Sequence, residues 1–227
     1  MTDLNHRALN AGPYYGQQEL LQPARSPLYP VVKRIIDIAG ASLGLILLLP
    51  LFLVIMLLIK LDDPKGPVIF RQIRIGKNGR PFYMYKFRSM VVGSEEMLPH
   101  LLDRNDLSGP MFKMKDDPRV TRVGRVLRKF SLDELPQLWN VLKNDMSLVG
   151  PRPALPREVE QYSALDRQRL LVMPGCTGLW QVSGRSGLSF EQMIELDLYY
   201  IQHQSIWLDL VLIAKTFRAV LSTRNAY

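Results

Sequence analysis

The sequence predicts an α+β fold, mainly α, in which a membrane helix, a β-hairpin and interfacial amphipathic helices surround a small domain. Three observations predict this class. A long apolar segment lies near the N-terminus, two short strand-like segments flank a turn, and two later segments repeat their apolar residues at helical spacing. With 227 residues, 47% of them hydrophobic, the chain is long enough for one core and one membrane element.

The chain divides into three parts by composition. Residues 1–30 are rich in Pro, Gln, Tyr and Asn and show no periodicity, which predicts a flexible N-terminal tail. Residues 31–60 form the membrane helix, and residues 61–227 form a membrane-associated domain. The one cysteine, Cys176, excludes an intramolecular disulfide and indicates a reducing compartment, where it is a structural thiol.

The apolar segment permits two interpretations. From Ile38 to Ile59 there are 22 residues without a charge, which as a straight helix would measure about 33 Å and span a bilayer. Pro50 lies in its middle and favours a kink. Basic residues flank both ends, which suits two cytoplasmic ends and a helix that enters and leaves one leaflet. The residues alone leave both interpretations open. The length of the segment favours a span, and Pro50 does not exclude one, because membrane helices tolerate proline.

The positive charge is concentrated after this segment. The net charge is +8, and residues 60–129 account for all of it, with sixteen Lys and Arg against eight Asp and Glu. Such clusters attract anionic lipid headgroups. No recognised nucleic-acid motif accompanies the basic block, so membrane lipids are the predicted partner and nucleic acid is not.

The domain begins with a predicted β-hairpin. Residues 67–75 and 81–87 are rich in aromatic and β-branched residues, and Gly76-Lys77-Asn78-Gly79 separates them. Residues 119–130 follow as a basic amphipathic helix, and residues 205–221 as an amphipathic helix with Trp207 near its start. Both suit an interfacial position, although a solvated face over a core fits the first equally well.

Phe130 to Pro153 carries the strongest chemical signal. Ser131-Leu132-Asp133-Glu134 fits a capping box, with Ser131 or Asp133 as the cap. Pro136 favours Asp133, because proline is harmless only in the first helical turn. Either choice puts Asp133 at the positive end of a helix, which favours its ionised form. An ionised carboxylate can attack phosphorus or hold Mg²⁺, whereas simple capping is the alternative.

Cations accompany the acidic pair along the chain. Gly150-Pro151-Arg152-Pro153 predicts a rigid turn that presents one guanidinium, whose fork suits phosphate oxygens. Lys86 and Arg88 add two cations at the end of the hairpin. Two further pairs, Asp116-Asp117 and Asp62-Asp63, are rival metal candidates, but both precede proline in polar stretches and are more typical of turns.

These residues resemble one bacterial family over about residues 31–227. The shared motifs occur in order along the chain. They are Lys33-Arg34 before an apolar helix with a central Pro50, KFRSM at 86–90, DPRVTRVGRVLRKFSLDELPQLWNVL at 117–142, DMSLVGPRP at 145–153, PGCTGLWQVSGRS at 174–186 and DLYY at 197–200. Together they closely resemble the bacterial sugar transferases, the monotopic polyprenyl-phosphate phosphoglycosyl transferases.

The resemblance implies an enzyme of the minimal catalytic type. A nucleotide-diphosphate sugar, expected to be a UDP-hexose, would give its sugar-1-phosphate to polyprenyl (undecaprenyl) phosphate and so initiate a cell-surface glycan such as exopolysaccharide or capsule. The family uses the Asp of the Asp-Glu pair as nucleophile and binds Mg²⁺ there, which matches Asp133, with Glu134 as acidic partner. Residues matched to other active-site motifs are expected to bind substrate: Lys86, Arg88, Arg152 and Asp197.

The resemblance also implies a location and a topology. The family's apolar helix is re-entrant and breaks at its proline, so Pro50 is the expected break and the catalytic domain lies on the cytoplasmic face of the bacterial inner membrane. Asn144 departs from a commonly seen Gly, and residues 1–30 lack the extra membrane helices of longer relatives. A homo-oligomer is compatible with the sequence, which does not fix it.

Two other classes of function stay open. A membrane-anchored glycosyltransferase working through Asp116-Asp117 would release UDP instead of UMP. A non-catalytic basic membrane scaffold would release neither nucleotide and would tolerate loss of Asp133.

Overall fold

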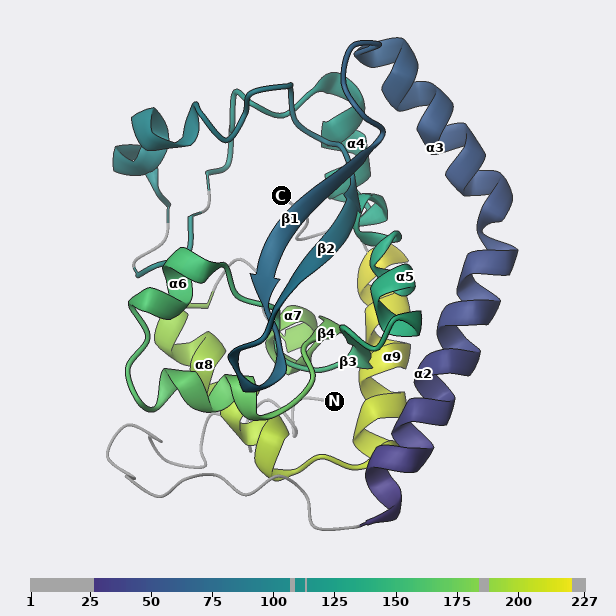
Figure 1. Ribbon diagram of the computed structural model, residues 1–227, viewed down its shortest axis with the longest axis vertical. Coiled ribbons are helices and arrows are strands. Elements are labelled where there is room, and N and C mark those ends of the chain that lie inside the picture. The colour runs from purple at the N-terminus through teal and green to yellow at the C-terminus, as the bar shows by residue number, and fades with distance from the viewer. Residues whose placement is uncertain (1–26, 107–108, 113, 184–187, 222–227) are drawn as a thin grey trace.

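A bent pair of helices forms one long side of the molecule (Figure 1). The computed structural model describes residues 27–106, 109–112, 114–183 and 188–221; most of the predicted tail therefore lies outside the described residues. The pair consists of α2, Leu28–Leu47, and α3, Leu49–Asp62. The helix thus begins three residues before the expected boundary at residue 31.

The bend lies where the sequence predicts it. The axes of α2 and α3 differ by 61° across Leu48, and Pro50 lies in the first turn of α3. Because proline has no backbone N–H, it cannot donate to the carbonyl of Ile46, and the helix does not continue straight. In the part of the chain that the structure describes, no single helix is long and apolar enough to cross a membrane; the bent pair meets that test only together. The kink is confirmed, and the straight helix is not formed.

The predicted hairpin is confirmed. Strands β1, Ile69–Ile75, and β2, Pro81–Phe87, pair antiparallel, with Ile69 opposite Phe87 and Ile75 opposite Pro81. The turn between them places Asn78 and Gly79 at positive φ, 56° and 76°, which these two residue types tolerate best. The hairpin lies across the middle of the molecule and leads back towards the helix pair (Figure 1).

Short elements complete a mixed α/β fold that is mostly helical. The predicted amphipathic helices are confirmed as α4, Arg122–Lys129, and α9, Ile206–Leu221. Strands β3 and β4 pair in parallel, with Ser147 opposite Gly175. The remaining helices and strands are α5 (Gln137–Leu142), β3 (Ser147–Val149), α6 (Pro156–Glu160), β4 (Gly175–Thr177), α7 (Leu179–Ser183) and α8 (Phe190–Gln202).

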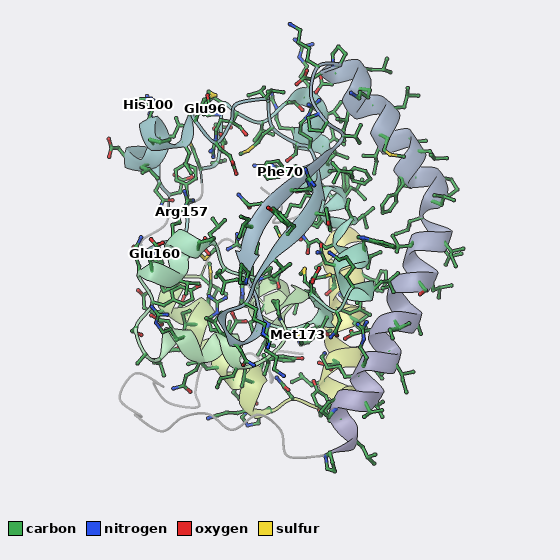
Figure 2. All side chains as sticks on the ribbon, in the orientation of Figure 1. Phe70, Glu96, His100, Arg157, Glu160 and Met173 are labelled. Atoms are coloured by element: carbon green, nitrogen blue, oxygen red, sulfur yellow. The ribbon has the colours of Figure 1, made fainter. Side chains whose placement is uncertain are left out.

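Three apolar clusters hold these elements together. The largest surrounds α8 and α9, where Ile194, Leu198 and Leu212 are fully buried. A second joins α2, β2 and α5, and a third joins α3, β2 and α4 around Phe87. The inner side of the helix pair therefore belongs to the core. Its outer side carries large apolar side chains that are more than half exposed and project away from the domain (Figure 2): Leu28, Val31, Ile35, Leu43, Ile46, Leu47, Leu49, Leu53, Val54, Leu57 and Leu61.

Candidate active site

The acidic pair lies in a tight turn and not in a capped α-helix. Ser131 adopts the left-handed conformation, with φ of 55°, and makes no capping hydrogen bond; Leu132–Glu134 form one 3₁₀ turn. Helix α5 begins only at Gln137, after Pro136. Because Pro136 cannot donate a backbone hydrogen bond, the turn closes through bonds that join residues three apart instead of four. One of them runs from Glu134 N to the Ser131 carbonyl, 3.3 Å. Capping by Ser131 or Asp133 was therefore the wrong expectation.

Lys86 of β2 reaches the acidic pair. Its Nζ donates to Glu134 Oε1 at 2.6 Å, and its charge also acts on Asp133. Asp133 is buried, 7% exposed, whereas the Glu134 side chain is 36% exposed. The hairpin thus carries a cation from position 86 to a turn nearly fifty residues later in the chain.

The two neighbouring carboxyl groups have different acidities. Burial raises the pKa of Asp133, and the charges of Lys86 and Arg128 offset this only in part. Burial also raises the pKa of Glu134, but Lys86, then Arg152 and Arg74, outweigh it, so the pKa of Glu134 falls below its usual value. The expectation that a helix end favours the ionised form of Asp133 is corrected, because desolvation is the largest effect on this carboxyl and raises its pKa.

Two of these cations escaped the sequence reasoning. Arg128, on α4, donates from Nε to Ser89 Oγ at 3.0 Å, and its charge lowers the pKa of Asp133. Arg74, on β1, donates from Nη1 to the Pro153 carbonyl at 3.0 Å. Burial, then the neighbouring Arg152, lowers the pKa of Arg74 to about 9. Alternation along β1 was the available signal, since Arg74 is buried beside the exposed Ile73.

Arg152 stands on the predicted turn next to this group. Gly150 allows the close approach of the turn to β4, because a Cβ there would lie 2.4 Å from the Met173 carbonyl oxygen. The Arg152 side chain is 28% exposed, with Nη1 3.8 Å from Glu158 Oε1, and it lowers the pKa of Glu134. The fold therefore brings the cations Lys86 and Arg152 to the acidic pair of Asp133 and Glu134.

Arg88 and Asp197 lie elsewhere. Arg88 is buried and donates from Nη2 to the Asp63 carbonyl at 2.6 Å, which ties the hairpin to the segment after α3. Asp197 is fully buried in α8 and pairs with Arg169 at 2.6 Å. Burial raises the pKa of Asp197 to about 6 although Arg169 opposes it. The contacts of Arg88 and Asp197 are thus with Asp63 and Arg169, and substrate contact by these two residues stays a prediction.

The buried ion pair of Arg169 and Asp197 contacts the backbone of the Arg152 turn. Arg169 donates from Nη1 to the Tyr162 hydroxyl at 2.8 Å and from Nη2 to the Arg152 carbonyl at 3.5 Å. Asp197 holds Arg169 from the other side. Asp197 is thus connected to the backbone of the Arg152 turn through Arg169.

The remaining sequence expectations concern structural residues. Asp117 pairs with Arg119 at 2.6 Å, and Asp63 accepts from the Lys65 amide at 3.2 Å, as turn residues do. Burial raises the pKa of the Cys176 thiol, so it stays protonated and unreactive. The interpretations of Asp117 and Asp63 as turn residues and of Cys176 as a structural thiol agree with this geometry, whereas Asp62 is the last residue of α3 and its Oδ2 accepts from the Val123 amide on α4 at 3.2 Å.

The donor set suits a weakly held divalent cation. Within the described ranges, no group of three or more His, Cys, Asp or Glu side chains is placed to hold a metal. Asp133 and Glu134 supply two neighbouring carboxylates. Mg²⁺ is commonly held by one or two carboxylates together with substrate phosphates and water, so these two residues fit that mode of binding.

An acidic pair among cations, beside helices with an apolar outer side, is an arrangement typical of sites for phosphorylated groups next to an apolar phase. Comparison with known proteins gives the family. Residues 28–223 match the family model described as bacterial sugar transferase, and the chain belongs to that family. The resemblance drawn from the motifs is thereby confirmed.

Curated relatives cover most of the chain. It is 47% identical over 194 residues to the galactosyl transferase CpsE of Streptococcus agalactiae, covering 84% of this chain and 42% of the relative. It is 44% identical to the undecaprenyl-phosphate galactose phosphotransferase of Salmonella typhimurium, covering 86% and 42%. It is 43% identical to the exopolysaccharide production protein ExoY of Rhizobium meliloti, covering 88% and 90%. The chain thus spans less than half of the first two relatives and most of the third.

Proposed function

We propose that this protein transfers a sugar-1-phosphate from a UDP-hexose to undecaprenyl phosphate, with release of UMP, and so initiates exopolysaccharide or capsule synthesis. The name of the Salmonella relative supports undecaprenyl phosphate as acceptor and the transfer of a sugar phosphate, and the name of ExoY supports the pathway class. The observation that carries the proposal is the Asp133–Glu134 turn with Lys86 bound to it and Arg152 close by. It combines a nucleophile with cations for a pyrophosphate.

The first half of the reaction uses Asp133. In its ionised form, a carboxylate oxygen attacks the β-phosphorus of the nucleotide sugar, the bond from that phosphorus to the bridging oxygen breaks, and UMP leaves with the electron pair. Lys86, Arg152 and Arg128 provide positive charge around the phosphates in a partly desolvated site. Asp133 and Glu134 are the residues that would hold Mg²⁺, which would supply further positive charge to the pyrophosphate.

The second half returns Asp133 to its starting state. A phosphate oxygen of undecaprenyl phosphate attacks the phosphorus of the aspartyl-phosphosugar, the bond from phosphorus to Asp133 breaks, and a lipid-linked diphosphosugar forms. This acceptor stays in the bilayer, so the site must lie at headgroup depth. The apolar outer side of α2 and α3 supports such a placement.

For the membrane, we propose a re-entrant helix pair. The 61° bend and the apolar outer side support entry into one leaflet and return, with the break at Leu48 and Pro50. Both ends of the pair and the domain then lie on the cytoplasmic face of the bacterial inner membrane. The glycosyltransferase alternative has less support, because Asp117 is held by Arg119.

One experiment tests reaction class and nucleophile together. Purified protein with Mg²⁺ and a UDP-sugar, but no lipid acceptor, should release at most one UMP per active site and gain the mass of a sugar phosphate on the peptide containing Asp133. Asp133→Asn should abolish the adduct and turnover, and Asp116→Asn, at an exposed carboxylate, should change neither. Steady-state kinetics should be ping-pong. Release of UDP, or an adduct on another residue, would contradict the assignment.

A further inference from the structure

The charged residues of α2 face the domain. Lys33 Nζ lies 2.8 Å from Asp209 Oδ2 on α9, and only 14% of the Lys33 side chain is exposed. Arg34 donates to the carbonyls of Val141 and Leu142 at 2.7 and 2.9 Å, at the end of α5. Lys33 and Arg34, which the sequence presents as part of the basic flank of the apolar segment, are therefore both engaged by the domain.

Asp37 is the third charged residue on this helix, and it is buried. Its Oδ1 accepts from Ser147 Oγ at 3.0 Å and from the Leu148 amide at 2.8 Å. Strand β3 pairs with β4 on one side only, through Ser147 and Val149. The Leu148 amide points to the unpaired side, where a parallel neighbour would otherwise accept its hydrogen bond. Asp37 takes the place of that neighbour.

Small residues bring α2 close enough for these bonds. Ala41 is fully buried. A Cβ added at Gly40 would lie 2.8 Å from Leu148 Cδ1, and one at Gly44 would lie 3.0 Å from Leu138 Cδ1. The helix therefore packs directly on β3 and α5, the two elements that adjoin the Arg152 turn and the acidic pair.

We propose that Asp37 is a positioning residue: through β3 it holds the Arg152 turn in place relative to Asp133 and Glu134, so that the helix pair sets the geometry of the site. Only Gly150 and Pro151 separate the end of β3 from Arg152. Arg34 holds the opposite end of α5 from the acidic pair, and the Lys33–Asp209 pair fixes the rotation of the helix. This inference rests on the function proposed above. It makes the contact between Asp37 and β3 the link between the membrane-facing helix pair and the active site.

The test uses full-length protein in lipid nanodiscs and measures UMP release from a UDP-sugar with undecaprenyl phosphate present. Asp37→Ala should lower kcat by at least about tenfold, because small displacements of a phosphate ligand are costly to rate. Asp37→Asn keeps an oxygen that can accept both bonds, and kcat should stay within about threefold of wild type. Ile38→Ala, at the exposed neighbouring position, is the matched control and should be neutral.

A second variant separates positioning from general stability. In an Arg152→Lys background, Asp37→Ala should lower kcat by less than about a further twofold, because the effects of coupled residues are not additive. Independent, additive losses would overturn the proposal, as would normal turnover by a folded Asp37→Ala protein. If Asp37→Ala does not accumulate, Ser147→Ala, which removes one of the two donors, takes its place; a several-fold loss at an unchanged thermal midpoint is expected, and normal turnover would refute the proposal.

Amide exchange keeps this inference distinct from the proposed reaction. The Leu148 amide should exchange faster in Asp37→Ala than in wild type, and unchanged exchange would overturn the role of Asp37 whatever the activity. Absence of UMP release by the wild-type protein would instead overturn the proposed reaction, and the exchange result would still decide whether Asp37 holds β3.

Discussion

At the scale of single residues, Asp133 and Glu134 are neighbours with opposite shifts in pKa. Glu134 is paired with Lys86 and is ionised over the physiological range, whereas burial makes Asp133 harder to ionise. Such a separation is typical of carboxyl pairs with different roles. It suits a reaction in which Glu134 holds cations and Asp133 alternates between a free carboxylate and an acyl phosphate.

Lys86 should tune the pH dependence of the reaction. Because its charge lowers the pKa of Asp133, Lys86→Gln should raise that pKa further. The nucleophile must be ionised, and its ionised fraction falls as the pH falls through the pKa. The acid limb of kcat/KM should therefore move to higher pH, in addition to any loss at the plateau, in a profile measured from about pH 5 to 9. Lys77→Gln, at the exposed hairpin turn, should leave the limb in place; an unmoved limb in Lys86→Gln would contradict the prediction.

At the scale of elements, two kinds of helix would contact the membrane in the proposed placement. The α2–α3 pair exposes apolar side chains along its outer side, and α4 exposes Arg122, Arg125 and Lys129 around the half-exposed Val126. The third apolar cluster packs α3 against α4. Insertion by the pair would thus bring the basic face of α4 to the headgroups.

The bend at Pro50 should decide topology. Single cysteines at Leu28 and Lys65, both exposed, should resist an impermeant thiol reagent in intact cells when placed in a Cys176→Ala background. Pro50→Leu restores the missing N–H, so it should straighten the pair and turn some molecules into spanning ones. Labelling at Leu28→Cys alone in the protein that keeps Pro50 would establish a span.

The charges on α4 should contribute to lipid binding. Arg122→Gln with Arg125→Gln should weaken binding to anionic vesicles by roughly fivefold for each charge removed, and less at high salt. Lys77→Gln with Arg80→Gln removes the same charge from the hairpin turn and serves as control. Vesicle sedimentation at two salt concentrations measures the binding of both double variants and its dependence on salt. Equal losses in the two double variants would show that net charge alone matters.

At the scale of the whole molecule, the largest cluster packs α8 and α9 against Val149 of β3, directly before the Gly150-Pro151-Arg152 turn. The buried ion pair of Arg169 and Asp197, whose carboxylate lies on α8, contacts the Arg152 carbonyl. The helix pair contributes to the other two clusters. Membrane element and domain therefore fold around shared side chains, and disruption of one is expected to affect the other.

Loss of Asp197 should destabilise the whole domain. Asp197→Ala leaves the Arg169 guanidinium buried without its counter-charge, which typically costs about 3–5 kcal/mol. The thermal unfolding midpoint in detergent should fall by several degrees, whereas Glu195→Ala, a partly exposed position on the same helix, should change it little. A folded Asp197→Ala protein with a normal midpoint and a large loss of turnover would instead favour direct substrate contact.

The sequence by itself determined the local features of this protein. Pro50 gave the bend, because its missing N–H acts within one helical turn, and two segments rich in aromatic and β-branched residues around Gly76-Lys77-Asn78-Gly79 gave the hairpin. The motifs identified the family and the residues to test. Helix boundaries near Asp133 were missed, because Ser131 to Glu134 fits a capping box, whereas the structure forms a separate 3₁₀ turn there and begins α5 only at Gln137.

Only the tertiary structure decided which charges act together. Lys33 and Asp209 are 176 residues apart, and Asp37 and Leu148 are 111 apart, so no local periodicity relates them. Arg74 and Arg128 act on the acidic pair, whereas Arg88 binds the segment after α3, for the same reason. The order of acidity in the pair also follows from burial, which is a property of the packed fold. Short-range sterics and hydrogen bonds are written in adjacent residues, whereas desolvation and ion pairing depend on which distant segments pack together.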